Sequence, residues 1–496
     1  MSGRHRTGQA MRGEPAEHRR PRYLPRQAVL LVLSAGLLLA CGPAPATDGF
    51  YDPGFASGGR RPVLVSGLHK LVGVHLRTDR SVLLAGRCDG FSTTGSIVGT
   101  LCAAELSVDG VPTDYGPVPA DTGPGMVAMT ELQPQLPGER YTAFDSATDT
   151  TGRLLIAAEL ESGGTYRASL ARFSPRGDSL EGLFIKAPAV NELDDSRFQA
   201  VIVDNQNRTL AAGSVRRTNG RLSLLLTRLG QDLNPDSTFG IDGSVRVDYV
   251  DRNSNAVDIE IDSQGRILVV CNQYQFDSTE TFNTVYRFTA MGTLDTTFGA
   301  GGETSVGSTL RAIAGGLAID ALDRPVVLGS TEDVFEGDRD LYVARFLSNG
   351  NPDNSFNTFP GISGGFLLIE AEDLVSVGPN EQPGDLLIQP NGKIVLAATV
   401  DRIDGNGTYF FSMRLLSNGT EDSSYGSGGI GLGTYAAAPS LGYSDFGRAI
   451  TLDPAGFLYY AGNSRGMNPL AFPTFGVARL IDADAREPSI FANGFD

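Results

Sequence analysis

Residues 257–302 read VDIEIDSQGRILVVCNQYQFDSTETFNTVYRFTAMGTLDTTFGAGG, and this stretch contains each phrase that the chain repeats. An alternating apolar run leads into a polar turn with Asp and Gly, and a second apolar run follows. A third apolar run ends in Arg-Phe, and the stretch closes on an Asp-Thr-Thr-Phe-Gly turn. Apolar runs that alternate with period two between Gly- and Asp-containing turns predict β-strands rather than amphipathic helices.

The strand–turn–strand phrase recurs along the chain at intervals of about 60 residues, a long period that is typical of repeat architectures. Asp and Gly suit the turn because Asp bonds to the backbone two residues on and Gly adopts positive φ. The turn positions that align across the seven copies are Arg77, Asp149, Asp204, Asp262, Asp320, Gln389 and Asp453.

A third strand follows the phrase in each copy and ends at a basic residue, except that Glu105 takes this place in the first copy. The recurrent basic residues are Arg172, Arg228, Arg287, Arg345, Arg414 and Arg479. An Asp-x-x-aromatic element and a fourth apolar run come next. The full element occurs as Asp236 with Phe239, Asp295 with Phe298, Asp353 with Phe356, and Asp422 with Tyr425. We expect the Asp to cap its turn or to bind the recurrent Arg, and the ring to pack between neighbouring units.

The two ends of the chain predict how the units are arranged. The seventh copy lacks the Asp-x-x-aromatic element, whereas YDPGFASGG (51–59) places one, Asp52 with Phe55, ahead of the first copy. The sequence therefore predicts an all-β, seven-bladed β-propeller of four-stranded blades over residues 50–482, in which the N-terminal strand completes the last blade. A solenoid of stacked β-turns is the alternative, but it requires neither four strands per unit nor an element divided between the ends. Residues 483–496 form a tail that we expect to pack on the last blade.

The three phrases, in this fixed order, resemble the delta-60 repeat family of bacterial surface and secreted proteins. The resemblance covers residues 50–482 and implies a propeller-like repeat domain and an exported location, but no particular activity. Glu105 departs from the family pattern. The aromatic elements of the first two copies, at 113–117 and 179–184, are degenerate, so the strands of these copies are the least defined.

Residues 1–40 have the features of a secretory signal. An Arg-rich stretch precedes AVLLVLSAGLLLACG (28–42), whose apolar run is too short to span a bilayer. LLAC (38–41) resembles the bacterial lipobox, so we expect lipidation at Cys41 and a membrane-anchored lipoprotein of the cell envelope, with residues 41–49 as a tether. The alternative is an ordinary signal peptide that happens to contain this Cys and releases a secreted protein. Neither interpretation places the protein in the cytoplasm.

The cysteines after the signal are interpreted structurally. Cys88 and Cys102 lie in two strand-like runs, and an exported protein meets an oxidising compartment, so we expect a disulfide between them. Two separate buried thiols are the alternative. Cys271 alternates into an apolar strand and is expected to be a buried thiol. A catalytic thiol would need a nearby His, and only His69 and His75 occur after the signal.

Composition and motifs leave few chemical functions. A formal net charge of −17 argues against nucleic acid as a partner. The sequence contains no G-x-S-x-G, H-E-x-x-H, P-loop or Cys-x-x-Cys motif. The acidic loops at 336–340 and 401–407 offer the oxygen ligands that Ca²⁺ prefers, but neither has a Glu at the closing position. We interpret both as solvated turns and predict no cofactor, with Ca²⁺ as the one candidate.

We favour a non-enzymatic function: a monomeric binding or interaction scaffold with a protein or glycan partner, which contacts the membrane through its lipid anchor alone. The contact candidates are loops that depart from the repeat, at 87–101, 273–283, 331–340 and 401–409. The alternative is a hydrolase or lyase acting on polysaccharide or lactone, with or without Ca²⁺, and a purely structural envelope component is a third interpretation. Inward acids that break the repeat at one end of the channel would favour the enzyme. An apolar channel would favour the scaffold.

Overall fold

The structure is a computed structural model, and the residues that it describes lie in the compact unit formed by residues 44–496. It describes residues 50–56, 58–63, 68–91, 97–113, 115–116, 129–132, 136, 138–275, 281–306, 311–332, 337–358, 365–435, 444–465 and 474–482. The expected signal segment with Cys41, the tether and the C-terminal tail lie outside these ranges. The described residues form 28 β-strands and one four-residue helix, α1 (Ala371–Leu374), so the all-β prediction is confirmed. That helix is too short to cross a membrane, and no longer apolar helix occurs in the described ranges.

Antiparallel groups of four strands make up the fold, and in each group the strands pair in chain order. The first three groups are β2 (Leu68–Leu76), β3 (Val82–Phe91), β4 (Ile97–Leu106), β5 (Met129–Leu132); β6 (Arg140–Thr148), β7 (Leu154–Ser162), β8 (Thr165–Phe173), β9 (Leu180–Ile185); and β10 (Glu192–Val203), β11 (Thr209–Arg217), β12 (Leu222–Leu229), β13 (Ser244–Val247). The second and third strands are apolar on both faces because each face packs against a neighbouring group.

The following groups repeat this pattern. They are β14 (Arg252–Ile261), β15 (Ile267–Gln275), β16 (Thr281–Phe288), β17 (Glu303–Val306); β18 (Arg311–Ile319), β19 (Pro325–Glu332), β20 (Arg339–Arg345), β21 (Phe366–Ile369); and β22 (Val377–Ile388), β23 (Ile394–Arg402), β24 (Thr408–Leu415), β25 (Ile430–Gly433). The helix α1 lies in the connection between β21 and β22.

The last group takes its strands from both ends of the chain. Its members are β26 (Ser444–Asp453), β27 (Phe457–Arg465), β28 (Thr474–Ile481) and β1 (Arg60–Val63). β1 pairs antiparallel with β28, and the register places Arg60 opposite Ala478. The N–H of Asp52 extends this pairing by donating to the carbonyl of Arg479 (2.9 Å).

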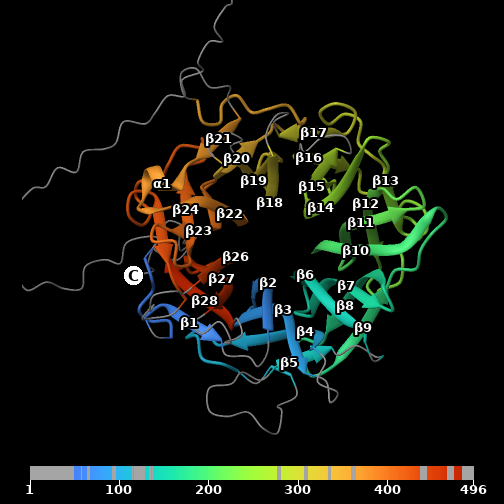
Figure 1. The fold of residues 1–496 in the computed structure, drawn as a ribbon, viewed down its shortest axis with the longest axis horizontal. Coiled ribbons are helices and arrows are strands. Elements are labelled where there is room, and N and C mark those ends of the chain that lie inside the picture. The colour runs from blue at the N-terminus through green and yellow to red at the C-terminus, as the bar shows by residue number, and fades with distance from the viewer. Residues whose placement is uncertain are drawn as a thin grey trace, which may run out of the picture. The chain divides into compact units, whose positions relative to one another are not determined.

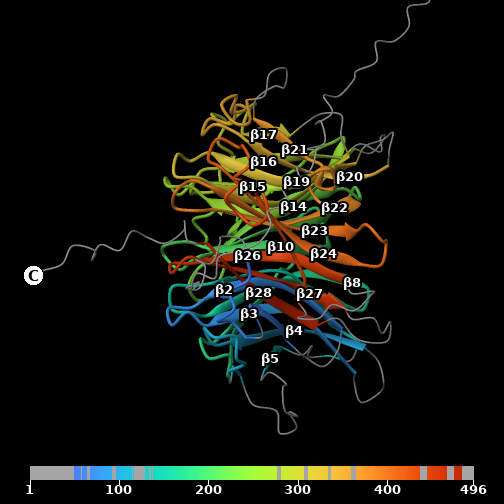
Figure 2. The same cartoon turned by 90° about the vertical axis from the view of Figure 1, so that its left-hand side faces the viewer.

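Figure 1 shows the groups side by side around a common centre, with the first strand of each group facing that centre. Seen from the side, the groups that begin with β22, β26 and β2 follow one another (Figure 2). The last and the first group share one hydrophobic core, in which Phe475 and Tyr459 pack with Leu71 and Leu84. Hydrogen bonding divides the described strands into sheets of 12, 8, 4 and 4 strands, none of which closes on itself.

The Asp-x-x-aromatic element joins one group to the next, as Asp295 and Phe298 illustrate. One oxygen of Asp295 accepts the N–H two residues on (3.1 Å), and the other accepts from Arg287 Nε (2.9 Å). The Arg287 guanidinium lies 4.6 Å from the centre of the buried Phe298 ring and donates to the carbonyl of Ser348 in the next group. Phe298 lies against Gly350, whose positive φ and missing side chain make room for the ring.

The same ion pair and ring contact recur in other groups. The sets are Arg228, Asp236 and Phe239; Arg345, Asp353 and Phe356; Arg414, Asp422 and Tyr425; and Arg479, Asp52 and Phe55. The last set combines residues from both ends of the chain. In the second group Arg172 lies 3.7 Å from Glu181 and donates to the carbonyl of Gln231.

In the first group the turn, and not the third strand, supplies the guanidinium of this joint. Glu105 stands where other groups have Arg, and it pairs with Arg77 (2.8 Å), which stands where most groups have Asp. Arg77 lies 5.7 Å from the centre of the Tyr115 ring and donates to the carbonyl of Pro175 in the next group. The irregular first repeat therefore keeps the function of the joint.

Candidate functional site

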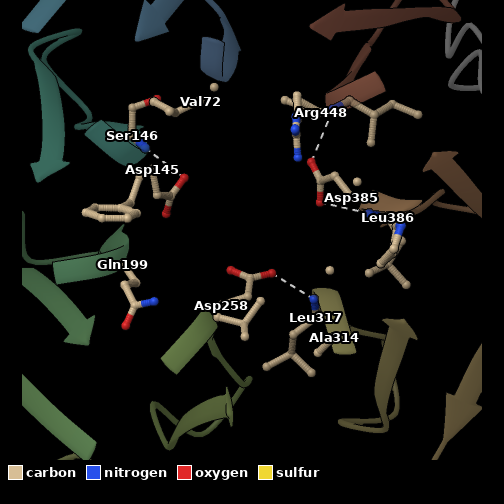
Figure 3. A pocket seen from close by; sticks show the side chains of 18 of the residues that line it. Val72, Asp145, Ser146, Gln199, Asp258, Ala314, Leu317, Asp385, Leu386 and Arg448 are labelled. Atoms are coloured by element: carbon tan, nitrogen blue, oxygen red, sulfur yellow. Dashed lines mark hydrogen bonds between the residues drawn. The ribbon is translucent and has the colours of Figure 1, made fainter. Parts of the chain in front are cut away.

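The first strands of the groups surround a central cavity of about 1040 Å³. Charged side chains reach into it from four groups, with Asp145 on β6, Asp258 on β14, Asp385 on β22 and Arg448 on β26 (Figure 3). The cavity is therefore polar, and it is not filled by apolar side chains.

A β-bulge in each first strand places the aspartates. In β6 the register shifts between Ala143 and Asp145, and an equivalent shift occurs in the first strand of every group. A bulge interrupts the ladder, so nearby main-chain N–H groups need other acceptors. The residue after the shift is Asp in three groups and small in the others, which have Gly73, Ala200, Gly316 and Ala449.

Each of the three aspartates accepts main-chain N–H groups from two neighbouring groups. On its own strand it accepts from the next residue, in the pairs Ser146–Asp145 (2.7 Å), Ile259–Asp258 (2.7 Å) and Leu386–Asp385 (2.8 Å). From the following group the donors are Val201 to Asp145 (2.8 Å), Leu317 to Asp258 (2.7 Å) and Ile450 to Asp385 (3.1 Å). The aspartates therefore hold adjacent groups together at the cavity wall (Figure 3).

Burial keeps protons on these carboxyl groups at higher pH than usual. It raises the pKa of Asp258 to about 6. Burial, followed by the charge of Asp258, raises the pKa of Asp385 to about 7 and that of Asp145 well above its ordinary value. The N–H donors oppose these shifts because they stabilise the charged form. The cavity wall therefore carries groups that change charge near neutral pH.

Glu260 is a cavity carboxylate that breaks the repeat and lies near the end of a first strand. It lies two residues after Asp258 and is partly accessible, and the main-chain N–H of Ile261 is the hydrogen-bond donor to its side chain. Burial and the charges of Asp258 and Asp385 raise its pKa well above the ordinary value. The equivalent residues in the other groups are His75, Ala147, Ile202, Ala318, Leu387 and Thr451.

Cationic groups line the other end of the cavity. Lys70 lies near the start of β2, and Glu260 lies near the end of β14. Both strands are the first of their groups and face the cavity, so the two residues lie at opposite ends of these inner strands. Burial, and then the charges of Arg448 and Arg87, lower the pKa of Lys70 to about 8. Lys70 and Arg339 therefore line the end of the cavity where the first strands begin, together with the acidic Glu381 and Asp401, whereas Glu260 lies farther in.

A Ser–His pair also lies on the cavity wall. His75 Nε2 and Ser146 Oγ are 2.8 Å apart, and burial lowers the pKa of His75 to about 4. Ser146 is 6% exposed, and a Cβ on Gly73 would lie 2.0 Å from its Oγ. Among the described residues, no carboxylate binds the other ring nitrogen of His75, as a catalytic triad requires. We therefore assign the pair to the joint between the first two groups.

The comparisons with known proteins agree with this architecture. Residues 263–298, 326–356 and 389–425 match the family described as a domain of unknown function (DUF5122) beta-propeller. The fold is a β-propeller. Each matched segment contains the second and third strands of a blade and reaches the Asp-x-x-aromatic element.

Solved structures with a similar fold include a polysaccharide lyase, the PL25 ulvan lyase (9% identity; 88% of this chain and 95% of that chain covered; TM-score 0.43). The β-propeller domain of the trilobed protease from Pyrococcus furiosus is another (9% identity; 87% and 100% covered; TM-score 0.42). A third is an exo-1,5-alpha-L-arabinanase from a bovine ruminal metagenomic library (10% identity; 75% and 99% covered; TM-score 0.33). No curated protein matches the sequence.

Most of the residues singled out from the sequence lie outside the cavity, but Arg339 and Asp401, from the loops 331–340 and 401–409, line it. The recurrent Asp, Arg and aromatic residues form the joints between blades, and none of them lines the cavity. Cys88 and Cys102 form a disulfide between β3 and β4, and Cys271 is a buried thiol in β15. In the sequence, Asp145 next to the turn residue Asp149 is typical of a solvated turn, but this interpretation is wrong, because Asp145 lies on β6 and binds main-chain N–H groups of two blades. No single repeat distinguishes Asp258, Asp385 or Glu260 from the other acidic residues.

Two of the nominated aromatic residues, Phe239 and Phe356, belong to the hydrophobic core and not to a functional site. Both side chains are 0% exposed, so neither ring can contact a ligand. Phe239 lies against Gly292, and Phe356 lies against Gly419, each in the turn of the following blade. The guanidinium of the preceding Arg covers each ring at 4.5 Å from its centre. Phe239 and Phe356 are therefore structural residues of the blade joints.

The nominated loops share one end of the propeller. Loops 87–101, 273–283, 331–340 and 401–409 all connect the second strand of a blade to its third, although parts of each belong to the strands. Because blades repeat the same strand directions, these connections lie at one end, where the inner strands begin; we call this end the loop face. Residues 92–96, 276–280 and 333–336 of these loops are outside the described ranges.

One group of acids in the described ranges has the spacing of a metal site. Asp338, Asp340 and Glu372 each offer an oxygen, and these oxygens lie within 4.8 Å of one another. The group lies on the loop face, because Asp338 and Asp340 are at the start of β20 and Glu372 is in the connection before β22. It is distinct from the aspartates of the cavity.

Proposed function

We propose that the chain is an exported, seven-bladed β-propeller, closed between its last and first blades and held at the cell envelope by a lipid on Cys41. On this proposal it binds a protein or glycan partner and does not transform a substrate. The lipobox-like LLAC (38–41) supports the anchor.

Contacts between the last and first blades support closure. Phe55 lies against Gly110 of the first blade, and the N–H of Ala56 donates to the carbonyl of Asp109 (2.8 Å). The equivalent contacts between two later blades are Phe298 with Gly350, and Gly299 with Asn349 (2.7 Å). The first and last blades therefore meet through the same joint as consecutive blades.

One observation supports a binding role above all: the carboxylates of the cavity aspartates accept hydrogen bonds from main-chain N–H groups of two neighbouring blades. A general acid or base needs an oxygen that can reach the substrate. Asp145, Asp258 and Asp385 each direct both oxygens to main-chain N–H groups, so they stabilise the ring. The loops that differ between blades all lie on the loop face, which suits the recognition of a large partner.

The proposal is tested by measuring binding and turnover side by side. The purified protein is run in affinity gels that contain alginate, pectin, xylan, arabinan or ulvan, and each polysaccharide is then assayed for new reducing ends and for unsaturated uronate. We expect no product from any of them, whether or not a polysaccharide retards the protein. Product formation above the buffer blank would overturn the non-enzymatic role.

Glu260 favours a second candidate function, a hydrolase or lyase of polysaccharide or lactone. It is an acid at one end of the cavity that breaks the repeat, and its raised pKa suits a general acid. If product appears, the variant Glu260→Gln decides the assignment, because an enzyme that uses this acid should lose at least about 100-fold in rate. Activity that survives in Glu260→Gln would exclude this site.

Anchoring is tested separately with Cys41→Ser. The wild-type chain should partition with membranes and incorporate a labelled fatty acid, and the variant should do neither. Equal partitioning of the two chains would leave an ordinary signal peptide as the explanation of residues 28–42.

A further inference from the structure

Four carboxylates converge on the loop face, where the blade that contains β20 meets the blade that begins with β22. Asp338, Asp340 and Glu372 have oxygens within 4.8 Å of one another. Glu381, near the start of β22, lies beside them, because it follows Asn380, which is paired with Arg339 between Asp338 and Asp340. Arg339 and Asn380, a residue from each of β20 and β22, are paired in parallel here, so the two blades are in direct contact.

Glu381 is the most buried of the four carboxylates. Its side chain is fully buried, and the geometry gives neither of its oxygens a hydrogen bond, although the Glu372 carboxyl group and the N–H of Ala371 are close enough to shift its pKa. A buried oxygen of Glu372 and one of Asp338 are also unpartnered. A buried polar group without a partner costs about 1–3 kcal/mol, and a buried charge costs more. Three carboxyl groups with such oxygens in one place indicate a site built for something they bind.

Three of the four carboxylates have no side-chain cation as a partner in the described part of the chain. Among the described residues, no Lys or Arg forms an ion pair with Asp338, Glu372 or Glu381. Arg339, the basic residue closest in sequence, instead lies 3.7 Å from Glu332. In the blade joints, by contrast, each recurrent Asp has an Arg partner.

We propose that Asp338, Asp340, Glu372 and Glu381 bind one Ca²⁺ ion. The donors are all carboxylate oxygens, which suit a hard cation and not the ions that prefer His or Cys. Four carboxylates, some of them bidentate, supply the six to eight oxygens that Ca²⁺ takes in flexible geometry, whereas Mg²⁺ requires a near-ideal octahedron and retains its waters.

The ion would connect two blades at the face proposed for partner binding. Asp338 and Asp340 belong to the loop 331–340, and Glu372 and Glu381 belong to the connection into the next blade and to its first strand. Ca²⁺ would therefore fix this loop relative to its neighbour. This inference does not depend on the binding role, because a cation can be held here whether the protein is a scaffold or an enzyme.

Calorimetric titration of the purified full-length protein with CaCl2, after treatment with EDTA, tests the proposal. We expect about one Ca²⁺ per chain and a rise in Tm of about 2–5 °C at saturating Ca²⁺. Glu381→Gln and Asp338→Asn should each weaken binding at least about 10-fold. Asp404→Asn is the matched control, since Asp404 lies in the other acidic loop and pairs with Arg402 (3.1 Å); it should bind Ca²⁺ like the wild type.

Several outcomes would overturn the assignment. These are the absence of saturable binding at millimolar Ca²⁺, tighter binding of Mg²⁺ than of Ca²⁺, or unchanged affinity in Glu381→Gln. An equal loss in Asp404→Asn would also exclude this cluster as the site. Asp338 is half-buried in a loop, so Asp338→Asn provides the test if Glu381→Gln does not fold.

Discussion

Arg77 and Glu105 form an ion pair of 2.8 Å at the position where other blades have a turn Asp and a strand Arg. In blades such as that of Arg287, the strand Arg pairs instead with the Asp of the Asp-x-x-aromatic element, and the turn Asp pairs with the Arg four residues on. In the first blade Arg77 of the turn reaches the next blade through the carbonyl of Pro175. The joint therefore requires one guanidinium between the blades, and either of two positions can supply it.

This relationship predicts a rescue. Glu105→Arg should lower the free energy of unfolding by about 2–4 kcal/mol, because it removes the partner of a largely buried guanidinium and adds a second positive charge. Adding Arg77→Asp should restore part of this loss, because the two positions then carry opposite charges again. Denaturant unfolding of the two single variants and the double variant gives the coupling energy.

The control for this cycle is Asp109→Asn, on the exposed turn of the same blade, which should change stability by less than about 0.5 kcal/mol. Losses that simply add in the double variant would show that no ion pair forms between the two positions once their charges are exchanged.

The N-terminal segment should be part of the folded ring. Phe55 is fully buried and lies 5.8 Å from Tyr459, centre to centre, in an edge-on contact. Phe55→Ala should therefore cost about 3–5 kcal/mol of stability, as expected for a buried aromatic ring, and Phe298→Ala should cost a similar amount. The midpoints of urea unfolding measure both.

Phe50, which is 48% exposed, supplies a matched control from the same segment, and Phe50→Ala should leave the midpoint nearly unchanged. If Phe55→Ala behaved like Phe50→Ala, the segment before β2 would not contribute to the fold.

The disulfide between Cys88 and Cys102 should stabilise the first blade. Its sequence separation of 14 corresponds to about 3 kcal/mol of loop-closure entropy. Reduction should therefore lower the thermal midpoint of the wild type and leave that of the double variant Cys88→Ala/Cys102→Ala unchanged. A drop of equal size in both proteins would assign the effect to another target of the reductant.

The joints were predictable from sequence because each repeat carries its own copy. Asp295, Phe298 and Arg287 lie within 12 consecutive residues, so their pairing requires only local turn chemistry. The cavity aspartates carry a weaker signal, since Asp145 and Asp258 each stand four residues before a turn Asp, as Asp385 does before Gln389. The Asp is present in every second blade, so the pattern becomes visible only when all copies are aligned at the bulge.

The acidic cluster was not predictable in the same way. The loop 331–340 is acidic, but the carboxylates that complete the cluster, Glu372 and Glu381, come from the connection to the next blade. Their proximity to Asp338 depends on how two blades pack. A search for a closing Glu within one loop therefore cannot find them.

Asp385 predicts how stability depends on pH. Burial, followed by the charge of Asp258, raises its pKa from 3.8 to about 7 in the folded protein, so the folded state holds this proton more tightly than the unfolded chain. Its contribution is fully present below about pH 4 and is lost as pH rises through about 7. The wild type should therefore gain stability from Asp385 when the pH falls from 8 to 5.

The variant Asp385→Asn isolates this contribution. An amide does not titrate here and still accepts the N–H of Ile450 or of Leu386, so the gain between pH 8 and pH 5 should shrink by about 1–2 kcal/mol relative to the wild type. Asp404→Asn, at an exposed carboxylate whose pKa is lowered mainly by Arg402, should leave the gain unchanged in this pH range. The measurement is urea unfolding at intervals of half a pH unit. Parallel curves for the wild type and Asp385→Asn would show that Asp385 is ionised in the folded protein throughout, and that its role at the joint does not involve a proton.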